Sequence, residues 1–186
     1  MILSASRSLA RFSALIRRLG ADRRGVSAVE FALLAPFMVA LYLGSVELSQ
    51  AIAANRKVTL AARTVSDLVS RVSAVNDTDL ANSLNAAKAV MAPHSPEKLT
   101  VIVSSLSIDN RGRATVVWSE ALNGSPRARD SRVTIPTAFA VPNTTLIWSE
   151  VSYRYVPIVG DALIGSMMLH DQNFSYPRLS KAVERT

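Results

Sequence analysis

The sequence contains no cysteine and only two histidines, His94 and His170. The absence of cysteine excludes disulfides and thiolate metal sites, and two histidines this far apart give no metal-ligand spacing. We therefore expect no metal and no cofactor, and we interpret both histidines as solvated surface residues. An exported domain without disulfides has to be stabilised by its own hydrophobic core.

Catalytic signatures are also absent from the sequence. The chain has no Gly-x-Ser-x-Gly elbow, no phosphate-binding glycine loop and no dinucleotide fingerprint. Serines are numerous, but no pattern pairs one of them with a base, and the carboxylates are scattered along the chain. We therefore predict that the protein is not an enzyme.

The positive charge is concentrated at the amino end. Residues 1–24 contain six arginines against one aspartate, so this segment carries +5 of the net charge of +7. Because the rest of the chain is only weakly basic, no nucleic-acid partner is predicted. The arginines of the polar loop at residues 127–132 are interpreted as a solvated face or as a partner contact. Four aromatic residues on strand patterns are interpreted as core or interface residues: Trp118, Trp148, Tyr153 and Tyr155.

The longest apolar run extends over residues 26–46 and contains one charged residue, Glu30. At about 1.5 Å per residue, a helix of this length spans roughly 30 Å, which matches the hydrocarbon thickness of a bilayer. We therefore predict a transmembrane helix at about residues 26–46. A carboxylate at mid-bilayer costs on the order of 3 kcal/mol. Glu30 therefore either lies near the interface and snorkels or has a functional partner.

The flanking charges predict the orientation of this helix. Arginines close to a span hold the amino end in the cytoplasm, so residues 1–25 are interpreted as a basic cytoplasmic leader. The chain then crosses the inner (cytoplasmic) membrane once, and its carboxyl-terminal domain is periplasmic. A twin-arginine signal at residues 23–24 or a transit peptide fits the surrounding pattern poorly. An ordinary secretory signal cleaved after residues 51–53 remains an alternative.

The helical pattern does not stop at the end of the apolar run. Spacing of three to four residues predicts one continuous helix over residues 26–75, half of it outside the membrane. The apolar positions that carry this pattern are Leu48, Ile52, Val58, Ala61, Val65, Leu68 and Val72.

Residues 76–186 are predicted to form a small extracytoplasmic α+β domain with an antiparallel sheet. A polar N-cap cluster starts a short helix that Pro93 ends, and a hairpin follows at residues 98–118. A short strand is expected at 132–135 and a long one at 144–156. The remaining expectations are a loop or a short amphipathic turn at 157–172 and an edge strand at 174–180.

The segment around the start of the span carries a resemblance. Gly25 follows two arginines, Glu30 is the fifth residue after that glycine, and Phe31 comes directly behind. This arrangement resembles the prepilin-peptidase site of type IV pilin-like proteins. The stretch Gly-Val-Ser-Ala-Val-Glu-Phe-Ala-Leu-Leu-Ala-Pro is similar to the opening of TadE-like pseudopilins of tight-adherence (Tad) pili. The resemblance covers roughly residues 20–70 and implies a pilin-like fold.

The resemblance also implies roles for individual residues. Gly25 would precede the cut, Val26 would become the new amino terminus, and Glu30 and Phe31 would act in assembly. The implied partners are other pilin or pseudopilin subunits, a prepilin peptidase and membrane lipid. The implied function is that of a minor pilin or pseudopilin in the assembly of Tad-type pili for adhesion.

Two departures from the small Tad major pilins favour a minor component over the main building block. Phe31 stands where those pilins usually carry tyrosine, and the chain is far longer than they are. Two alternatives remain open. One is an uncleaved single-pass envelope anchor with a partner-binding periplasmic domain. The other is a secreted enzyme or binding module released near Ala53.

Overall fold

The computed structural model describes residues 23–158 and 165–186, so the leader expected at residues 1–25 lies almost entirely outside the described residues. Compact packing divides the chain into two units, residues 1–46 and residues 47–186. One helix, α2 (Arg23–Ser70), runs through the point of division without interruption. The fold class is α+β, with a long amino-terminal apolar helix followed by a domain that contains a curled antiparallel sheet of five strands. The predicted fold class is confirmed.

The described part of the first unit is the apolar start of α2. Its large apolar side chains are exposed on every side, including Phe37 at 71% and Leu41 at 75%. The helix remains continuous through Pro36. From Gly25 onward, α2 is long and apolar enough to cross a membrane, by length and composition.

The second unit begins with the polar half of α2, whose hydroxyl groups are bonded within the helix itself. Thr64 donates to the Leu60 carbonyl oxygen at 2.8 Å and Ser70 donates to the Asp67 carbonyl oxygen at 2.9 Å. Such bonds to the preceding turn allow serine and threonine inside a helix. The helix ends at Ser70, before the predicted end at residue 75, because Ala74–Val75 form strand β1, which pairs with β7 (Glu184–Arg185) in parallel.

Helix α3 (Asp77–Met91) follows, with the capping that the polar cluster at its start predicts. The Asn76 side chain accepts a hydrogen bond from the Asp79 backbone N–H, and the Asp79 carboxylate accepts one from the Asn76 backbone N–H. This reciprocal pair satisfies two donors at the helix start that would otherwise be free. Beyond the helix, a short 3-10 turn (Pro96–Lys98) leads into the sheet.

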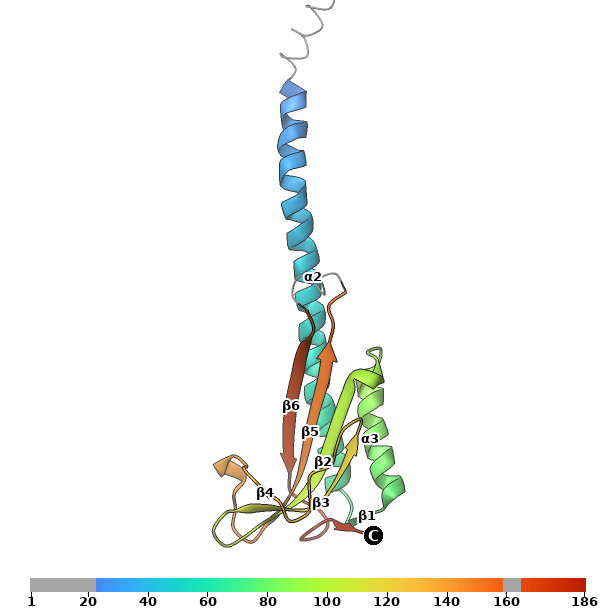
Figure 1. Cartoon of the computed structure of the whole chain (residues 1–186), viewed down its shortest axis with the longest axis vertical. Coiled ribbons are helices and arrows are strands. Elements are labelled where there is room, and N and C mark those ends of the chain that lie inside the picture. The colour runs from blue at the N-terminus through green and yellow to red at the C-terminus, as the bar shows by residue number, and fades with distance from the viewer. Residues whose placement is uncertain (1–22, 159–164) are drawn as a thin grey trace, which may run out of the picture. The chain divides into compact units, whose positions relative to one another are not determined.

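The main sheet has the strand order β4-β3-β2-β5-β6, and its neighbouring strands are antiparallel (Figure 1). The predicted hairpin is formed by β2 (Leu99–Ile108) and β3 (Ala114–Leu122), and a register shift lies between Ser105 and Leu106. The remaining elements are β4 (Arg132–Val133), a 3-10 turn (Thr137–Phe139), β5 (Thr145–Tyr155) and β6 (Met167–Ser175).

The larger core lies between the two helices and one face of the sheet. Leu80 and Met91 of α3 belong to it together with Val101 of β2 and Val151 of β5. The residues of α2 in this core are Ala54, Val58, Ala61, Ala62, Val65 and Val69. A smaller core on residues such as Leu106 and Leu146 is covered by Ile135 and Phe139.

The buried stripe of α2 agrees with the predicted one at Val58, Ala61 and Val65, which are fully buried, but not at its two ends. Leu48 and Ile52 are exposed at 62% and 48%, whereas the smaller Ala54 and Ala62 are fully or almost fully buried. The Ser149 hydroxyl of β5 donates to the Ala62 carbonyl oxygen, so the helix backbone lies directly against the sheet. Alanines and valines of α2 share this contact, whereas the larger Leu48 and Ile52 lie outside it.

The two predictions for the end of the chain are wrong in part. Residues 167–172 belong to β6 and not to a loop, while residues 159–164 of the predicted loop lie outside the described residues. The predicted edge strand at 174–180 does not extend past Ser175. Met167–Ser175 contains no β-branched residue, so local propensity does not reveal the strand. It forms because β5 offers nine consecutive partners.

Candidate functional site

The residues predicted for processing and assembly lie at the start of α2. Gly25 and Val26 are in its first turns, and Glu30 and Phe31 follow on the next turn. All four residues are exposed, with Val26 at 57% and Phe31 at 66%. In the part of the chain that the structure describes, the Glu30 carboxylate has neither a hydrogen bond nor an ion pair.

The surroundings of Gly25 leave it open to another molecule. A Cβ atom built on Gly25 would have no heavy atom within 4 Å, and the same holds for Gly44 further along the helix. Neither glycine is therefore required by close packing in this structure.

In the arginine loop, Arg129 and Arg132 are exposed as predicted, whereas Arg127 is partly buried. Arg127 donates through Nε and Nη2 to the two carboxylate oxygens of Glu150, each at 2.7 Å. Its guanidinium also lies 4.2 Å from the centre of the Trp148 ring. These hydrogen bonds to Glu150 raise the pKa of Arg127 above its ordinary value. Arg127 therefore holds the loop against the sheet. Because Glu150 is distant from Arg127 in the sequence, this role can be recognised only in the tertiary structure.

We expect Arg127→Ala to destabilise the domain by about 2 kcal/mol. The substitution removes a paired and stacked cation and leaves Glu150, whose side chain is 12% exposed, without its partner. Arg127→Lys should recover only part of the loss, because lysine lacks the two-pronged geometry. Urea unfolding of the full chain in detergent micelles, followed by tryptophan fluorescence, measures the difference. Equal stability of Arg127→Ala and the wild type would contradict this role.

The histidines do not come together. The His94 ring lies 5.6 Å from the Tyr153 ring, and burial lowers the pKa of His94, so this residue is not a fully solvated surface group as predicted. His170 lies on β6, where its Nδ1 and the Ser152 hydroxyl are 2.9 Å apart. Within residues 23–158 and 165–186, no group of His, Asp and Glu side chains could hold a metal ion. The four aromatic residues predicted as core or interface are all buried.

The position of the alternative cleavage near Ala53 lies within α2. Ala54 is fully buried in the larger core, and α2 continues through it without a break. A cut after Ala53 would therefore sever a packed helix at its contact with the sheet.

Comparison with known proteins gives one match. The family model described as TadE-like protein matches residues 25–67, from the glycine before the apolar run to the packed half of α2. No curated protein and no solved structure matches the chain significantly. TadE-like proteins are generally non-enzymatic pilus components, so the match suggests a protein associated with the Tad pilus. Residues 25–67 of this chain are a TadE-like protein family domain.

Proposed function

We propose that the protein is a minor pilin or pseudopilin that takes part in the assembly of Tad-type pili. The observation that carries the proposal is the TadE-like match, which begins at Gly25, where the basic leader meets the apolar helix. An apolar helix exposed on every side supports membrane anchoring. The arginines before it favour a cytoplasmic amino end and a periplasmic domain in the inner membrane.

The proposed mechanism uses four residues. A prepilin peptidase cuts after Gly25, where the missing side chain lets the backbone enter a protease closely. The cut leaves the α-amino group of Val26 as a new positive charge inside an apolar environment. Glu30 of one subunit then pairs with the α-ammonium group of a neighbouring subunit. Each charge alone is costly in lipid, and pairing them lowers that cost and fixes the register of the two helices. Phe31 packs beside this pair.

Processing is tested by the mass of the mature chain. We expect the chain isolated from membranes of a host with a prepilin peptidase to begin at Val26 and to retain its full leader when the peptidase gene is deleted. Gly25→Ala should slow processing by about tenfold, because a methyl group obstructs the approach of the protease. Intact-mass spectrometry and pulse-chase gels measure both effects.

Gly44→Ala is the matched control for this experiment. It makes the same change in the same helix, and at both positions an added Cβ meets no heavy atom within 4 Å. Any difference between the two variants therefore reports on the protease and not on folding. An intact leader in the wild-type chain would instead support the uncleaved single-pass anchor with a partner-binding domain.

A further inference from the structure

Two large apolar side chains are exposed where β5 ends and β6 begins. Ile158 follows the end of β5 and is 86% exposed, more than any other large apolar side chain of the described residues. Met168 lies at the start of β6 and is 64% exposed. Single exposed apolar residues are common on protein surfaces, so the meaning of this pair depends on where it lies.

The contacts of β5 with α2 show which end of the domain carries the pair. The Ser149 hydroxyl donates a hydrogen bond to the Ala62 carbonyl oxygen. Six residues later in the strand, the Tyr155 hydroxyl donates to the Glu47 carboxylate at 3.4 Å. Strand β5 therefore runs toward the start of α2, and its last residue reaches the level of Glu47.

The contacts of β6 give the same direction. The Asn173 side-chain amide donates to the Ser66 hydroxyl at 2.6 Å, and the Asp171 carboxylate accepts a hydrogen bond from the Thr59 hydroxyl. Going back along β6 therefore leads toward the start of α2. The strand begins at Met167, which pairs with the last residue of β5. The beginning of β6 and the end of β5 thus lie at the same end of the domain.

Glu47 marks the end of the apolar run in the sequence. It is the first charged residue after Glu30, so residues 31–46 contain no charge. If that run lies in the bilayer, as proposed above, Glu47 lies at the level of the lipid headgroups. The inference rests on the proposed membrane anchor in this step. A side chain that projects past Tyr155 in the same direction then meets the membrane surface.

The chain between the two strands is poor in charge. Between Arg154 and His170 the sequence contains one charged residue, Asp161. Connections between strands are usually polar because they lie in water. A connection with so little charge, flanked by the exposed Ile158 and Met168, is suited to contact with lipid.

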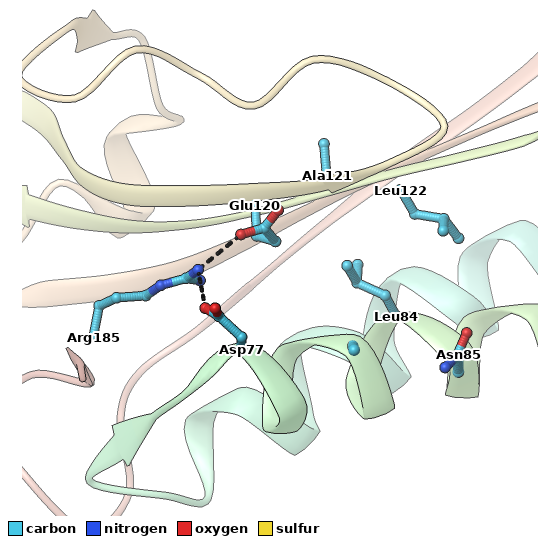
Figure 2. A pocket seen from close by; sticks show the side chains of 8 residues that line it. Asp77, Leu84, Asn85, Glu120, Ala121, Leu122 and Arg185 are labelled. Carbon is cyan, nitrogen blue, oxygen red and sulfur yellow. Dashed lines mark hydrogen bonds and ion pairs between the residues drawn. The ribbon is translucent and has the colours of Figure 1, made fainter.

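The opposite end of the domain, beyond the end of α2 at Ser70, is charged instead. Figure 2 shows the Arg185 guanidinium between Glu120 and Asp77. Its Nη2 atom lies 3.0 Å from the Glu120 carboxylate and 2.6 Å from the Asp77 carboxylate. Strand β7, which contains Arg185, pairs with β1, the element that follows α2 in the chain. Ion pairs therefore lie at the end far from Glu47, and exposed apolar side chains lie at the end beside it.

We propose that Ile158 and Met168 form a second membrane contact, in which this end of the sheet inserts its apolar side chains into the surface of the bilayer that α2 spans. The occupant is lipid, because the pair lies at the level where the apolar run of the same chain ends. Burial of the two side chains among the lipids favours the contact. A second point of attachment restricts the motion of the domain relative to the membrane surface.

Fluorescence quenching in lipid nanodiscs tests the proposal. The sequence contains no cysteine, so Ile158→Cys and Met168→Cys each place a single fluorescent label on the full chain. The nanodiscs consist of phosphatidylcholine, part of which carries a spin label near the top of one acyl chain. The spin label quenches fluorophores that enter the bilayer surface. We expect quenching at the two test positions to be about threefold stronger than at Leu179→Cys.

Leu179→Cys is the matched control, because its side chain is 73% exposed and lies at the other end of the domain. The backbone N–H of the preceding residue, Arg178, donates to the Ser70 carbonyl oxygen at 2.8 Å. At about 1.5 Å per residue, α2 places Ser70 about 35 Å from Glu47. Quenching at the two test positions that is no stronger than at Leu179 would overturn the proposal.

Leu41→Cys, within the apolar run, separates this proposal from the membrane anchor itself. The Leu41 side chain is 75% exposed, so a label there reports whether α2 lies in the bilayer. Quenching at Leu41 but not at the test positions would overturn the second contact and leave the anchor intact. Absence of quenching at Leu41 would contradict both. A label emission that shifts with protein concentration and not with the spin label would overturn the proposal in favour of a second copy of the chain.

A charge placed in the contact gives an independent test, with the label at Met168. Ile158→Asp removes little internal contact, because the side chain is exposed, and a carboxylate resists entry into lipid. We expect it to lower quenching at Met168 by about twofold. Val141→Asp makes a similar change at an exposed apolar residue before the start of β5 and should leave the quenching unchanged. Equal quenching in the two variants would contradict insertion of Ile158.

Discussion

Glu30→Gln is expected to reduce incorporation of the protein into pili by tenfold or more while leaving it folded and in the membrane. The side chain is exposed and has no partner within the described residues, so its removal costs the subunit no internal contact. In the assembled state the proposed α-ammonium partner would be left as an unpaired charge in an apolar environment. Breaking a buried ion pair by removing one partner typically costs about 3–5 kcal/mol, which is well over tenfold in affinity.

The measurement is the ratio of protein in sheared pili to protein in membranes, by quantitative immunoblot. Glu30→Asp, which keeps the charge on a shorter side chain, should recover part of the incorporation. Glu97→Gln is the matched control, because it makes the same change at an exposed position outside α2. Normal incorporation of Glu30→Gln would refute the pairing mechanism and favour an uncleaved anchor.

Leu99→Ala is expected to destabilise the domain by about 3 kcal/mol, within the range of about 2–5 kcal/mol for buried leucines. Leu99 starts the central strand β2 and is 0% exposed within the larger core. Deleting most of its side chain removes apolar contacts and leaves a cavity that rigid neighbours on the helices and the sheet cannot fill. A loss of this size is a large part of the stability of an ordinary domain.

Leu179→Ala makes the same chemical change at a position that is 73% exposed, and it should alter stability by less than about 0.5 kcal/mol. Both tryptophans, Trp118 and Trp148, are buried in this domain, so their fluorescence reports its unfolding in the full chain. Urea titration in detergent micelles gives the free energy of unfolding for each variant. Similar losses for the two variants would show that Leu99 does not occupy a rigid core.

Several elements could be predicted because their signals are local. The N-cap at Asn76, the hairpin on either side of residues 109–112 and the alternation in β5 each reside in a short stretch of sequence. The apolar run after Gly25 is equally local, and the family match begins at the same glycine. Each signal depends on backbone geometry or on period, which neighbouring residues set by themselves.

Other features depend on residues that are distant in the sequence. Strand β6 exists because it pairs with β5, and its sequence contains no β-branched residue. Arg127 fastens its loop only because the fold brings Glu150 and Trp148 to it.

The sequence by itself determined the apolar helix with its single acid, the basic segment before it and the presence of an antiparallel hairpin domain. These features follow from charge, period and turn chemistry within short windows. Only the tertiary structure decided which further residues of α2 are buried, because the Ala62 backbone lies against Ser149 of β5: Ala54 and Ala62 are buried there beside Val58 and Val65, whereas Leu48 and Ile52 are exposed. It also decided how far β4 extends along β3, because the two strands pair only at Ala114 and Thr115.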